Sequence, residues 1–291
     1  MVEQRCMIDV KDLSFCYGRA NRPLFQNVDL ELPAGTICGM LGANGAGKST
    51  LLKLLAGLSF PQQGRCDVLS YTPSERLPAF LADIFLVPED IFVAPVTPTI
   101  YARRFGGFYP RFDQATFEKL LADFALSADR KLTAYSYGEK KKFLLAFGIA
   151  TNARLLLMDE PTNGLDIPGK SQFRRALINH FAPERSFLIS THQVHDLRGL
   201  IDSVMIIAEG SILLHATLDA LAARLQVQLE PEAPDDALYV EETLEGFRVV
   251  RENSSGAQAD LDLELLLGLV TSNSAPVRQL LSDAGLSGAR S

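Results

Sequence analysis

The chain has 291 residues, of which 47% are hydrophobic and 22% charged, and this composition fits one large domain, or one domain with an appendage, around a sizeable core. Its net charge of −7 argues against a general nucleic-acid binder, because such proteins carry a basic surface. No apolar run approaches the roughly 20 residues that cross a bilayer, and residues 1–10 lack the apolar segment of a signal peptide.

The N-terminal part contains three predicted strands followed by a predicted helix. Residues 6–18 and 27–35 alternate apolar and polar side chains, which is typical of strands with one exposed face. Residues 36–42 (TICGMLG) are continuously apolar, as expected of a strand that is buried on both faces. Residues 48–58 have helical spacing, and Gly57 is the predicted stop.

Residues 41–50 (LGANGAGKST) join the third strand to this helix and match the pattern G-x-x-x-x-G-K-[ST]. Glycines let successive backbone N–H groups point at a phosphate chain, and the helix N-terminus adds further N–H groups. The lysine of this pattern reaches the β- and γ-phosphates, and its hydroxyl residue ligates Mg²⁺. A plain glycine-rich turn with an exposed lysine would not account for the strand before it and the helix after it. The predicted nucleotide-binding residues are Gly42, Asn44, Gly45, Ala46, Gly47, Lys48, Ser49 and Thr50, with Ser49 also a metal ligand.

Predicted strands and predicted helices alternate through the middle of the chain. The strands lie at 83–88, 154–159, 186–191 and 202–208, and the helices at 112–126, 137–151, 169–181 and 194–200. Strands that alternate with helices form a parallel sheet with helices on both faces. The sequence therefore predicts an α/β fold.

Two acids, Asp159 and Glu160, end the strand at 154–159. The carboxyl ends of parallel strands are where α/β proteins place their ligands. Asp159 is predicted to hold Mg²⁺, and Glu160 to polarise a water for attack on the γ-phosphate. Such a pair alone is more often a solvated strand edge, but behind a phosphate-binding loop it predicts hydrolysis of a nucleoside triphosphate.

The composition changes near residue 225, since residues 225–252 contain eight Asp or Glu and only two Arg. The acidic stretch 230–236 (EPEAPDD) predicts a linker. Beyond it we expect a hairpin at 237–253 that turns at Glu245-Gly246, a helix at 261–270 and a second short helix at 275–285. This region is a predicted small appended domain, to which the sequence gives no chemistry.

In their order along the chain, these motifs resemble the ATP-binding subunit of ATP-binding cassette (ABC) transporters over roughly residues 6–224. The resemblance implies a P-loop NTPase fold of the α/β class, with a parallel core sheet, an antiparallel β subdomain and a helical subdomain at about 99–150. It divides the chain into an ABC-type ATP-binding domain at 1–224 and a small accessory α+β domain at 225–291.

The resemblance assigns part of the site to a second subunit. Residues 135–141 (YSYGEKK) resemble the family signature Leu-Ser-Gly-Gly-Gln, in which Ser136 and Gly138 keep the essential positions. In the family, this segment caps the γ-phosphate that the opposite subunit holds. Asp166 ends a segment, 163–166, that resembles the family loop crossing the dimer interface, and is expected to belong to the nucleotide site.

Two further residues come from the same resemblance. Tyr17 is similar to the aromatic residue that stacks on adenine, and its alternative role is that of a core aromatic at a strand end. His192, at the end of SFLIST, resembles the switch histidine that contacts the γ-phosphate. We therefore expect His192 to act in catalysis with Glu160.

Three residues depart from the family pattern. Tyr137 stands where the first signature glycine usually sits, so this position is not expected to need a positive φ. Glu139 replaces the signature glutamine, and Glu89 stands near the position of a glutamine that touches Mg²⁺ and the attacking water. A carboxylate at Glu89 can still ligate Mg²⁺ and act in catalysis, but its charge predicts slower turnover or a stronger Mg²⁺ requirement.

Two clusters of basic residues are also assigned. Lys140, Lys141 and Lys142 are interpreted as a solvated helix face near a bound phosphate rather than as a partner site. Arg103 and Arg104 lie where the helical subdomain of the family meets its membrane partner. They are a candidate docking site, with an ordinary amphipathic surface as the equal alternative.

The predicted function is ATP hydrolysis coupled to substrate transport across a membrane, as the motor subunit of an exporter-type ABC transporter. The resemblance implies ATP and Mg²⁺ as cofactors, a transmembrane permease subunit as partner, a head-to-tail homodimer on ATP binding and no nucleic acid. The expected location is cytoplasmic, peripheral at the inner face of the cell membrane, which agrees with four scattered, reduced cysteines. The alternative is an ATP-dependent regulatory switch with little hydrolysis, suggested by Glu89 and Glu139. An ABC protein of translation or DNA repair fits less well, because tandem cassettes and long coiled coils are missing.

Overall fold

The computed structural model describes residues 6–18, 23–234, 236–253, 262–272 and 277. Its centre is a six-stranded sheet of the order β5-β6-β7-β3-β8-β9. The strands are β3 (Ile37–Leu41), β5 (Ile84–Val87), β6 (Leu155–Asp159), β7 (Ser186–Thr191), β8 (Ser203–Ala208) and β9 (Ser211–Thr217). Only the edge strand β9 runs antiparallel to its neighbour. The predicted parallel core sheet is therefore confirmed.

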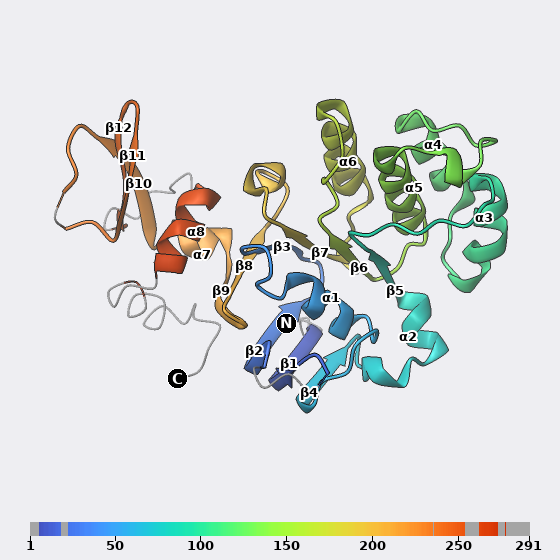
Figure 1. Cartoon of the computed structure of the whole chain (residues 1–291), viewed down its shortest axis with the longest axis horizontal. Helices are drawn as coiled ribbons and strands as arrows, with labels where there is room; N and C mark the ends of the chain where they lie inside the picture. Colours follow the sequence, from blue (N-terminus) through green and yellow to red (C-terminus); the bar gives the residue numbers. More distant parts are fainter. Residues whose placement is uncertain (1–5, 19–22, 235, 254–261, 273–276, 278–291) are drawn as a thin grey trace.

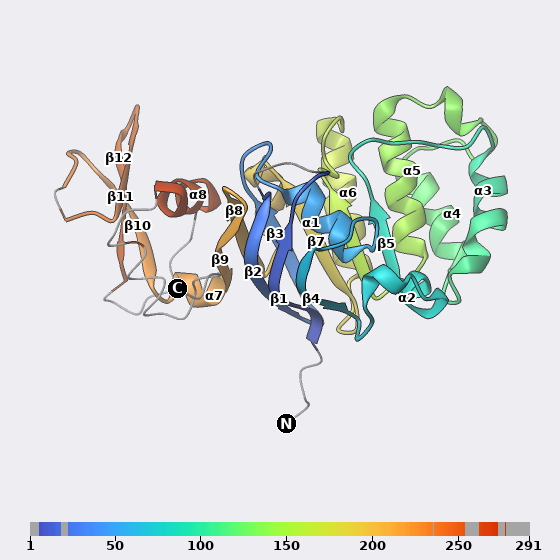
Figure 2. The same ribbon diagram turned by 60° about the horizontal axis from the view of Figure 1, so that its bottom comes forward.

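A second sheet packs against the first one through a helix. Its order is β2-β1-β4, all antiparallel, with β1 (Cys6–Phe15), β2 (Phe25–Pro33) and β4 (Gln63–Val68). Helix α1 (Lys48–Leu55) lies between the two sheets (Figures 1 and 2), and its leucines share one buried cluster with residues of both. This sheet is the expected antiparallel β subdomain.

Helices cover the other side of the core sheet. They are α3 (Pro98–Phe105), α4 (Gln114–Asp123), α5 (Tyr137–Ala150) and α6 (Ile167–His180), with short 3₁₀ turns η2 (Gly106–Phe108) and η3 (Leu132–Ala134). The turn η1 (Pro73–Glu75) and helix α2 (Pro78–Asp83) lie instead on the side of α1, since Phe80 of α2 belongs to the same buried cluster as the leucines of α1. Phe147 of α5 is the centre of an aromatic cluster that holds α3, α4 and α5 together, because it contacts Tyr101, Phe112 and Phe117.

The helix predicted at 194–200 is wrong. The chain forms only a four-residue 3₁₀ turn, η4 (Val194–Leu197). Arg198 has an extended ψ of 126°, and Gly199 follows with a φ of +68°, so the helical hydrogen-bond pattern ends there. Helical spacing over seven residues did not distinguish one turn from a helix.

The C-terminal region forms a third sheet of the order β10-β12-β11, at the opposite end of the molecule from α3 and α4 (Figure 1). Its elements are α7 (Leu218–Ala222), β10 (Leu225–Glu230), β11 (Tyr239–Thr243), β12 (Gly246–Glu252) and α8 (Leu263–Ser272). The predicted hairpin is confirmed by the pairing of β11 with β12. The helix predicted at 261–270 is α8, whereas the one predicted at 275–285 falls outside the described residues, apart from residue 277.

The predicted linker is wrong, because residue 230 still belongs to β10, and the acidic segment that follows joins β10 to β11. Among the described residues that follow it, no separate core forms. Leu266 and Leu269 of α8 belong to the same buried cluster as Val204 of β8 and Leu214 of β9. Helix α8 packs on η4, β8, β9 and β11, so the C-terminal region and the core sheet share one interior.

A candidate nucleotide site at the carboxyl edge of the core sheet

The predicted phosphate-binding loop lies between the end of β3 and the start of α1. Gly47 is the N-cap of α1 with a φ of +109°, and a Cβ there would lie 2.6 Å from Cζ of Phe25. Gly45 has a φ of +83°. Both positions therefore require glycine, the first for conformation and space and the second for conformation. Helix α1 begins at Lys48, as predicted, so its first N–H groups face the loop.

Lys48 points back into this loop. Its Nζ donates to Gly42 O at 2.7 Å and to Ala43 O at 3.2 Å, and lies 3.7 Å from Oε1 of Glu160. Both Lys48 and Glu160 are buried. A buried ammonium needs partners for its N–H groups, and here the loop carbonyls and one carboxylate provide them.

The acid pair is held by the neighbouring strand. Ser190 Oγ of β7 donates to Asp159 Oδ1 at 2.6 Å, while Glu160 N lies 3.1 Å from Ser190 O and 3.2 Å from its Oγ. Glu160 has a φ of +44°, which turns the chain out of the sheet directly after Asp159. The sequence analysis missed Ser190, although its place two residues before His192 on a buried strand was a usable signal.

His192 lies beside Glu160, because β6 and β7 are adjacent parallel strands that end at the same edge. The distance from His192 Nδ1 to Glu160 Oε1 is 3.0 Å, and His192 N donates to Glu160 Oε2 at 3.4 Å. The structure thus brings Lys48, Glu160 and His192 together around one carboxylate.

Tyr17 lies at the open side of the loop. Its hydroxyl is 2.8 Å from Oγ1 of Thr50 on α1, and its ring packs edge-on against Phe15. The ring remains 53% exposed, so its face is accessible. The alternative role of a core aromatic does not fit this exposure.

The signature segment begins α5. Ser136 is the N-cap: its Oγ accepts from Glu139 N at 3.2 Å, and its own N donates to Glu139 Oε2 at 2.7 Å, which completes a capping box. The bond from Ser136 N and the guanidinium of Arg130 lower the pKa of Glu139. Tyr137 is the first helical residue and has no positive φ, as expected. Glu139 therefore replaces glutamine in a structural role at this helix start.

The chain is similar to known proteins in sequence and in structure. The ABC transporter family model matches residues 25–163. The cobalt import ATP-binding protein CbiO of Salmonella typhimurium is 31% identical over 219 residues, which are 72% of this chain and 80% of that protein. The chain belongs to the ABC transporter ATP-binding family. Membership makes it an ATP-binding subunit with ATPase activity coupled to transport.

Other members of the ABC family are similar to this chain in sequence or in fold. The bacitracin transport ATP-binding protein BcrA of Bacillus licheniformis is 29% identical, and the match covers 79% of this chain and 76% of that protein. The solved structure of an ATP-binding subunit of an ABC transporter has a TM-score of 0.67 at 25% identity, over 73% of this chain and 90% of the other. A dimeric ATP-binding cassette bound to ADP and phosphate has the same fold, with a TM-score of 0.64 at 20% identity.

Two predicted residues of this ABC ATPase lie at the segment after the acid pair: Gly138 contacts it and Asp166 ends it. A Cβ on Gly138 would lie 2.7 Å from Gly164 O, so glycine permits the close approach of α5 to this segment. Asp166 is the N-cap of α6, where Oδ1 accepts from Gly169 N at 3.0 Å and lies 3.3 Å from Nζ of Lys142. The bond from Gly169, followed by that from Lys142, lowers the pKa of Asp166. Within one subunit, Asp166 therefore has a structural role: it caps α6 and pairs with Lys142.

Glu89 follows β5, where Oε1 accepts from Asn163 Nδ2 at 3.4 Å. Beneath it lies Lys141, and the interpretation of this residue as part of a solvated face is wrong. Lys141 is fully buried, and burial lowers its pKa while nearby carboxylates act in the opposite direction. A usable signal was its spacing of four residues from buried Leu145 on the same helix. Lys140 and Lys142 are partly exposed.

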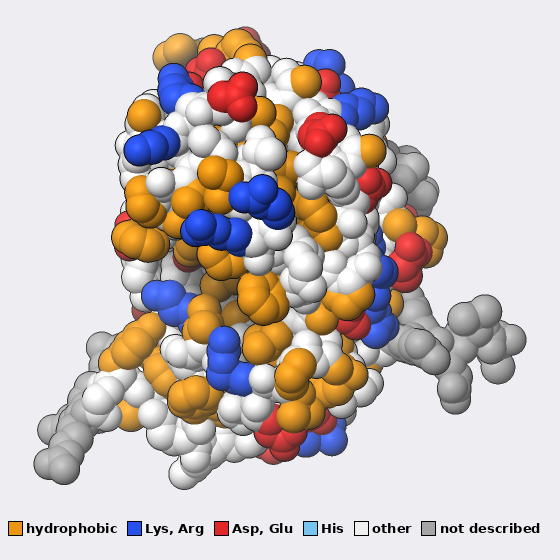
Figure 3. Space-filling model, turned by 90° about the vertical axis from the view of Figure 1, so that its right-hand side faces the viewer, with side chains coloured by type: hydrophobic (Ala, Val, Ile, Leu, Met, Phe, Trp, Pro, Cys, Tyr) orange, Lys and Arg blue, Asp and Glu red, His pale blue; other side chains and the backbone are white. Residues whose placement is uncertain are grey.

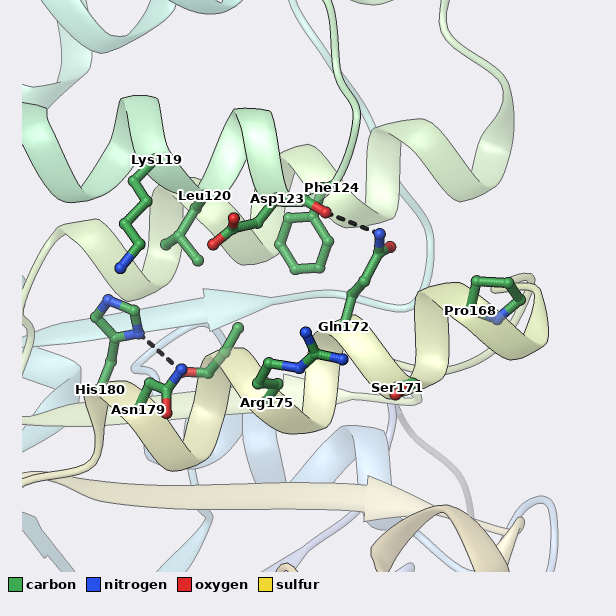
Figure 4. Close-up of a pocket in the computed structure, with 11 residues that line it drawn as sticks. Lys119, Leu120, Asp123, Phe124, Pro168, Ser171, Gln172, Arg175, Asn179 and His180 are labelled. Carbon is green, nitrogen blue, oxygen red and sulfur yellow. Dashed lines mark hydrogen bonds between the residues drawn. The ribbon is translucent and has the colours of Figure 1, made fainter.

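A polar groove of 530 Å³ lies away from this site, between α4 and α6 (Figure 4). Lys119 and Asp123 of α4 face Gln172 and Arg175 of α6, and Gln172 Nε2 donates to Asp123 O at 2.8 Å. Within the described ranges, no predicted nucleotide-site residue lines this groove. The groove has no part in the nucleotide site.

Proposed function

We propose that this ATPase drives an exporter-type transporter, with Glu160, His192 and Lys48 at the centre of its hydrolytic site. The observation that carries the proposal is that His192 and Lys48 both lie close to one oxygen, Oε1 of Glu160, at the end of β6. A buried carboxylate held between two such groups is placed to orient and polarise a water. His192 fixes the carboxylate in place, and Lys48 exchanges the carbonyls of its loop for nucleotide phosphates.

The donor set fits Mg²⁺. The proposed ligands are the Ser49 hydroxyl at the start of α1, the Asp159 carboxylate and the Glu89 carboxylate, and Mg²⁺ prefers such oxygens together with phosphate oxygens and water. Ser190 donates to only one oxygen of Asp159, which leaves the other for a metal or its water. The ion would neutralise charge on the β- and γ-phosphates. The residues of the chain orient the phosphates and the attacking water.

We further propose that Ser136, Gly138 and Asp166 serve the nucleotide of a second copy in a head-to-tail homodimer. The contact of Gly138 with the segment after the acid pair joins the two regions expected at such an interface. Ile167, next to Asp166, is 86% exposed, and Tyr137, next to Ser136, is 44% exposed. Apolar side chains at this degree of exposure support a covered surface on ATP binding.

A permease subunit is the proposed partner, and an apolar groove supports its docking. This groove of 600 Å³ runs between α2 and α3 and is lined by Leu81, Tyr101, Phe105 and Phe108, among other residues. Figure 3 shows this end of the molecule, where hydrophobic side chains surround lysines and arginines. The basic side chains proposed to take part are Arg103 and Arg104 of α3, since both follow Tyr101 into the last turn of that helix.

The proposed location, cytoplasmic and peripheral at the inner face of the cell membrane, follows from that partner. Within the described residues, no helix combines the length and hydropathy that crossing a membrane requires. The proposed direction is export. Its support is the single cassette of the chain, which resembles exporter systems; the relatives named for bacitracin and lantibiotic transport carry no direction in their names, and CbiO is named for cobalt import. The direction can be tested with vesicles that contain the permease and this subunit, by measuring whether labelled substrate is taken up or released.

The experiment that tests the site is Glu160→Gln. We expect a loss of ATPase activity of about 10²–10⁴-fold, because the base that polarises the water is removed. With saturating ATP and Mg²⁺, the variant should elute as a dimer in gel filtration. Glu184→Gln, the same change on an exposed loop, is the matched control and should behave like the wild type. A Glu160→Gln protein that hydrolyses ATP normally, or that stays monomeric, contradicts the proposal.

The regulatory switch is the second candidate, and its support is the acid at Glu89. Turnover of the purified chain with and without its permease separates the two functions. A motor should turn over faster with its partner, whereas a switch stays slow in both conditions.

A further inference from the structure

One buried lysine joins three parts of the site, and the proposed mechanism does not use it. Lys141 Nζ donates to Pro88 O at 3.1 Å, to Glu89 O at 3.2 Å and to Asp159 O at 3.4 Å. Pro88 and Glu89 follow β5, and Asp159 ends β6. Since Lys141 itself belongs to α5, a single side chain connects the signature helix with two neighbouring strand ends.

These contacts give each N–H donor of Lys141 an acceptor, but they provide no opposite charge for its ammonium group. An ammonium has three N–H donors, and the three carbonyls use all of them. Carbonyl oxygens carry only partial charges, and a full charge without an opposite charge is costly when buried. Four carboxylates act on Lys141 electrostatically, namely those of Asp159, Glu89, Glu160 and Asp90. They are the groups that offset its charge.

A second side chain of α5 holds the same loop. The Tyr137 hydroxyl donates to Glu89 O at 2.9 Å, so this carbonyl accepts from both Tyr137 and Lys141. The two residues are four apart, on one face of the first turns of α5. A rotation of the helical subdomain must therefore either move Glu89 or break both bonds.

We propose that Lys141 is a positioning residue for ATP hydrolysis: it fixes the loop that carries Glu89 and the strand end that carries Asp159 to the signature helix, and its charge offsets the additional carboxylate of Glu89. The inference rests on the proposed role of Glu89 and Glu160 in hydrolysis. It explains how a site with a glutamate in place of a glutamine keeps its charge in balance.

The test is a double-mutant cycle on the full chain. Lys141→Gln keeps N–H donors but removes the charge, and Glu89→Gln removes the carboxylate. We expect Lys141→Gln alone to lower kcat at least tenfold, with the KM for ATP changed less than threefold, because positioning acts on the chemical step. In the Glu89→Gln background, the same change should lower kcat threefold or less. Lys140→Gln, the same change on a partly exposed neighbour, should keep kcat within twofold of the wild type.

An equal loss of kcat in both backgrounds, or a kcat of Lys141→Gln within twofold of the wild type, overturns the inference. Thermal unfolding of Glu89→Gln gives a second measurement that does not require a folded Lys141 variant. Since the buried ammonium loses an offsetting charge, the unfolding temperature should fall by at least 2 °C. Glu232→Gln, the same change on the exposed loop after β10, should leave it unchanged. An unfolding temperature that does not fall also overturns the inference.

Glu160→Gln distinguishes the two proposals. If Glu160→Gln keeps the kcat of the wild type, the proposed hydrolytic site is wrong. If Glu160→Gln abolishes hydrolysis while Lys141→Gln keeps the kcat of the wild type, the proposed site stands and only the inference on Lys141 is wrong.

Discussion

Replacement of Leu269 in α8 by alanine tests whether the C-terminal region is part of the cassette. Leu269 is fully buried in the cluster that also contains residues of β8 and β9. Removal of a buried leucine side chain costs about 2–5 kcal/mol, so we take about 3 kcal/mol. For a chain of this length, 1 kcal/mol corresponds to roughly 2 °C in Tm, so Leu269→Ala should lower Tm by about 6 °C.

The assay is differential scanning calorimetry with circular dichroism as a second probe. If the interior is shared, one transition should move as a whole in both signals. Leu244→Ala is the matched control, because Leu244 is fully exposed at the turn between β11 and β12 and should leave Tm unchanged within about 1 °C. A small separate transition that moves while the main one stays in place would refute the shared interior.

Three further predictions concern the loop and the titrating groups. Gly47→Ala should destabilise the chain by about 1–3 kcal/mol more than Gly45→Ala in thermal unfolding, because both have positive φ but only Gly47 lacks space for a Cβ. Burial lowers the pKa of His215, so the unfolded chain binds an additional proton below about pH 6.5; stability should fall as the pH drops from about 7 to 5, and the fall should be smaller in His215→Gln. Burial raises the pKa of Cys38 and Cys66 to about 12, so iodoacetamide labelling followed by mass spectrometry should find both thiols roughly a thousandfold slower than in urea.

The sequence predicted those parts of the site in which the functional residues directly follow a single strand. The run before Asp159 is short and apolar, so its place in the sheet, and with it the position of Asp159 and Glu160, followed from the pattern. The run before His192 is also short and apolar, so the position of His192 at the end of β7 followed from the same pattern. The P-loop was equally clear, because a strand, a set of glycines and a helix start follow one another within a few residues.

The parts that could not be predicted depend on contacts between distant segments. Three lysines in a row look like a solvated face, yet successive helical residues are 100° apart, and the packing of α5 against β5 and β6 turns Lys141 inward. The acidic residues 230–236 have the composition of a linker, but residue 230 belongs to β10, whose partner β12 lies some twenty residues later. Neither local composition nor periodicity predicts which strand β10 pairs with.

Lys48 has a complete set of partners within the protein itself, namely Gly42 O and Ala43 O of the loop and the carboxylate of Glu160. A phosphate chain that enters does not have to assemble its cradle from a loose segment. In the proposed site it would replace the acceptors of one ammonium in a loop that is already folded, so little conformational entropy would be lost on binding. In the proposed mechanism, the same exchange would withdraw a cation from Glu160 as the substrate arrives and leave this carboxylate to act on the water.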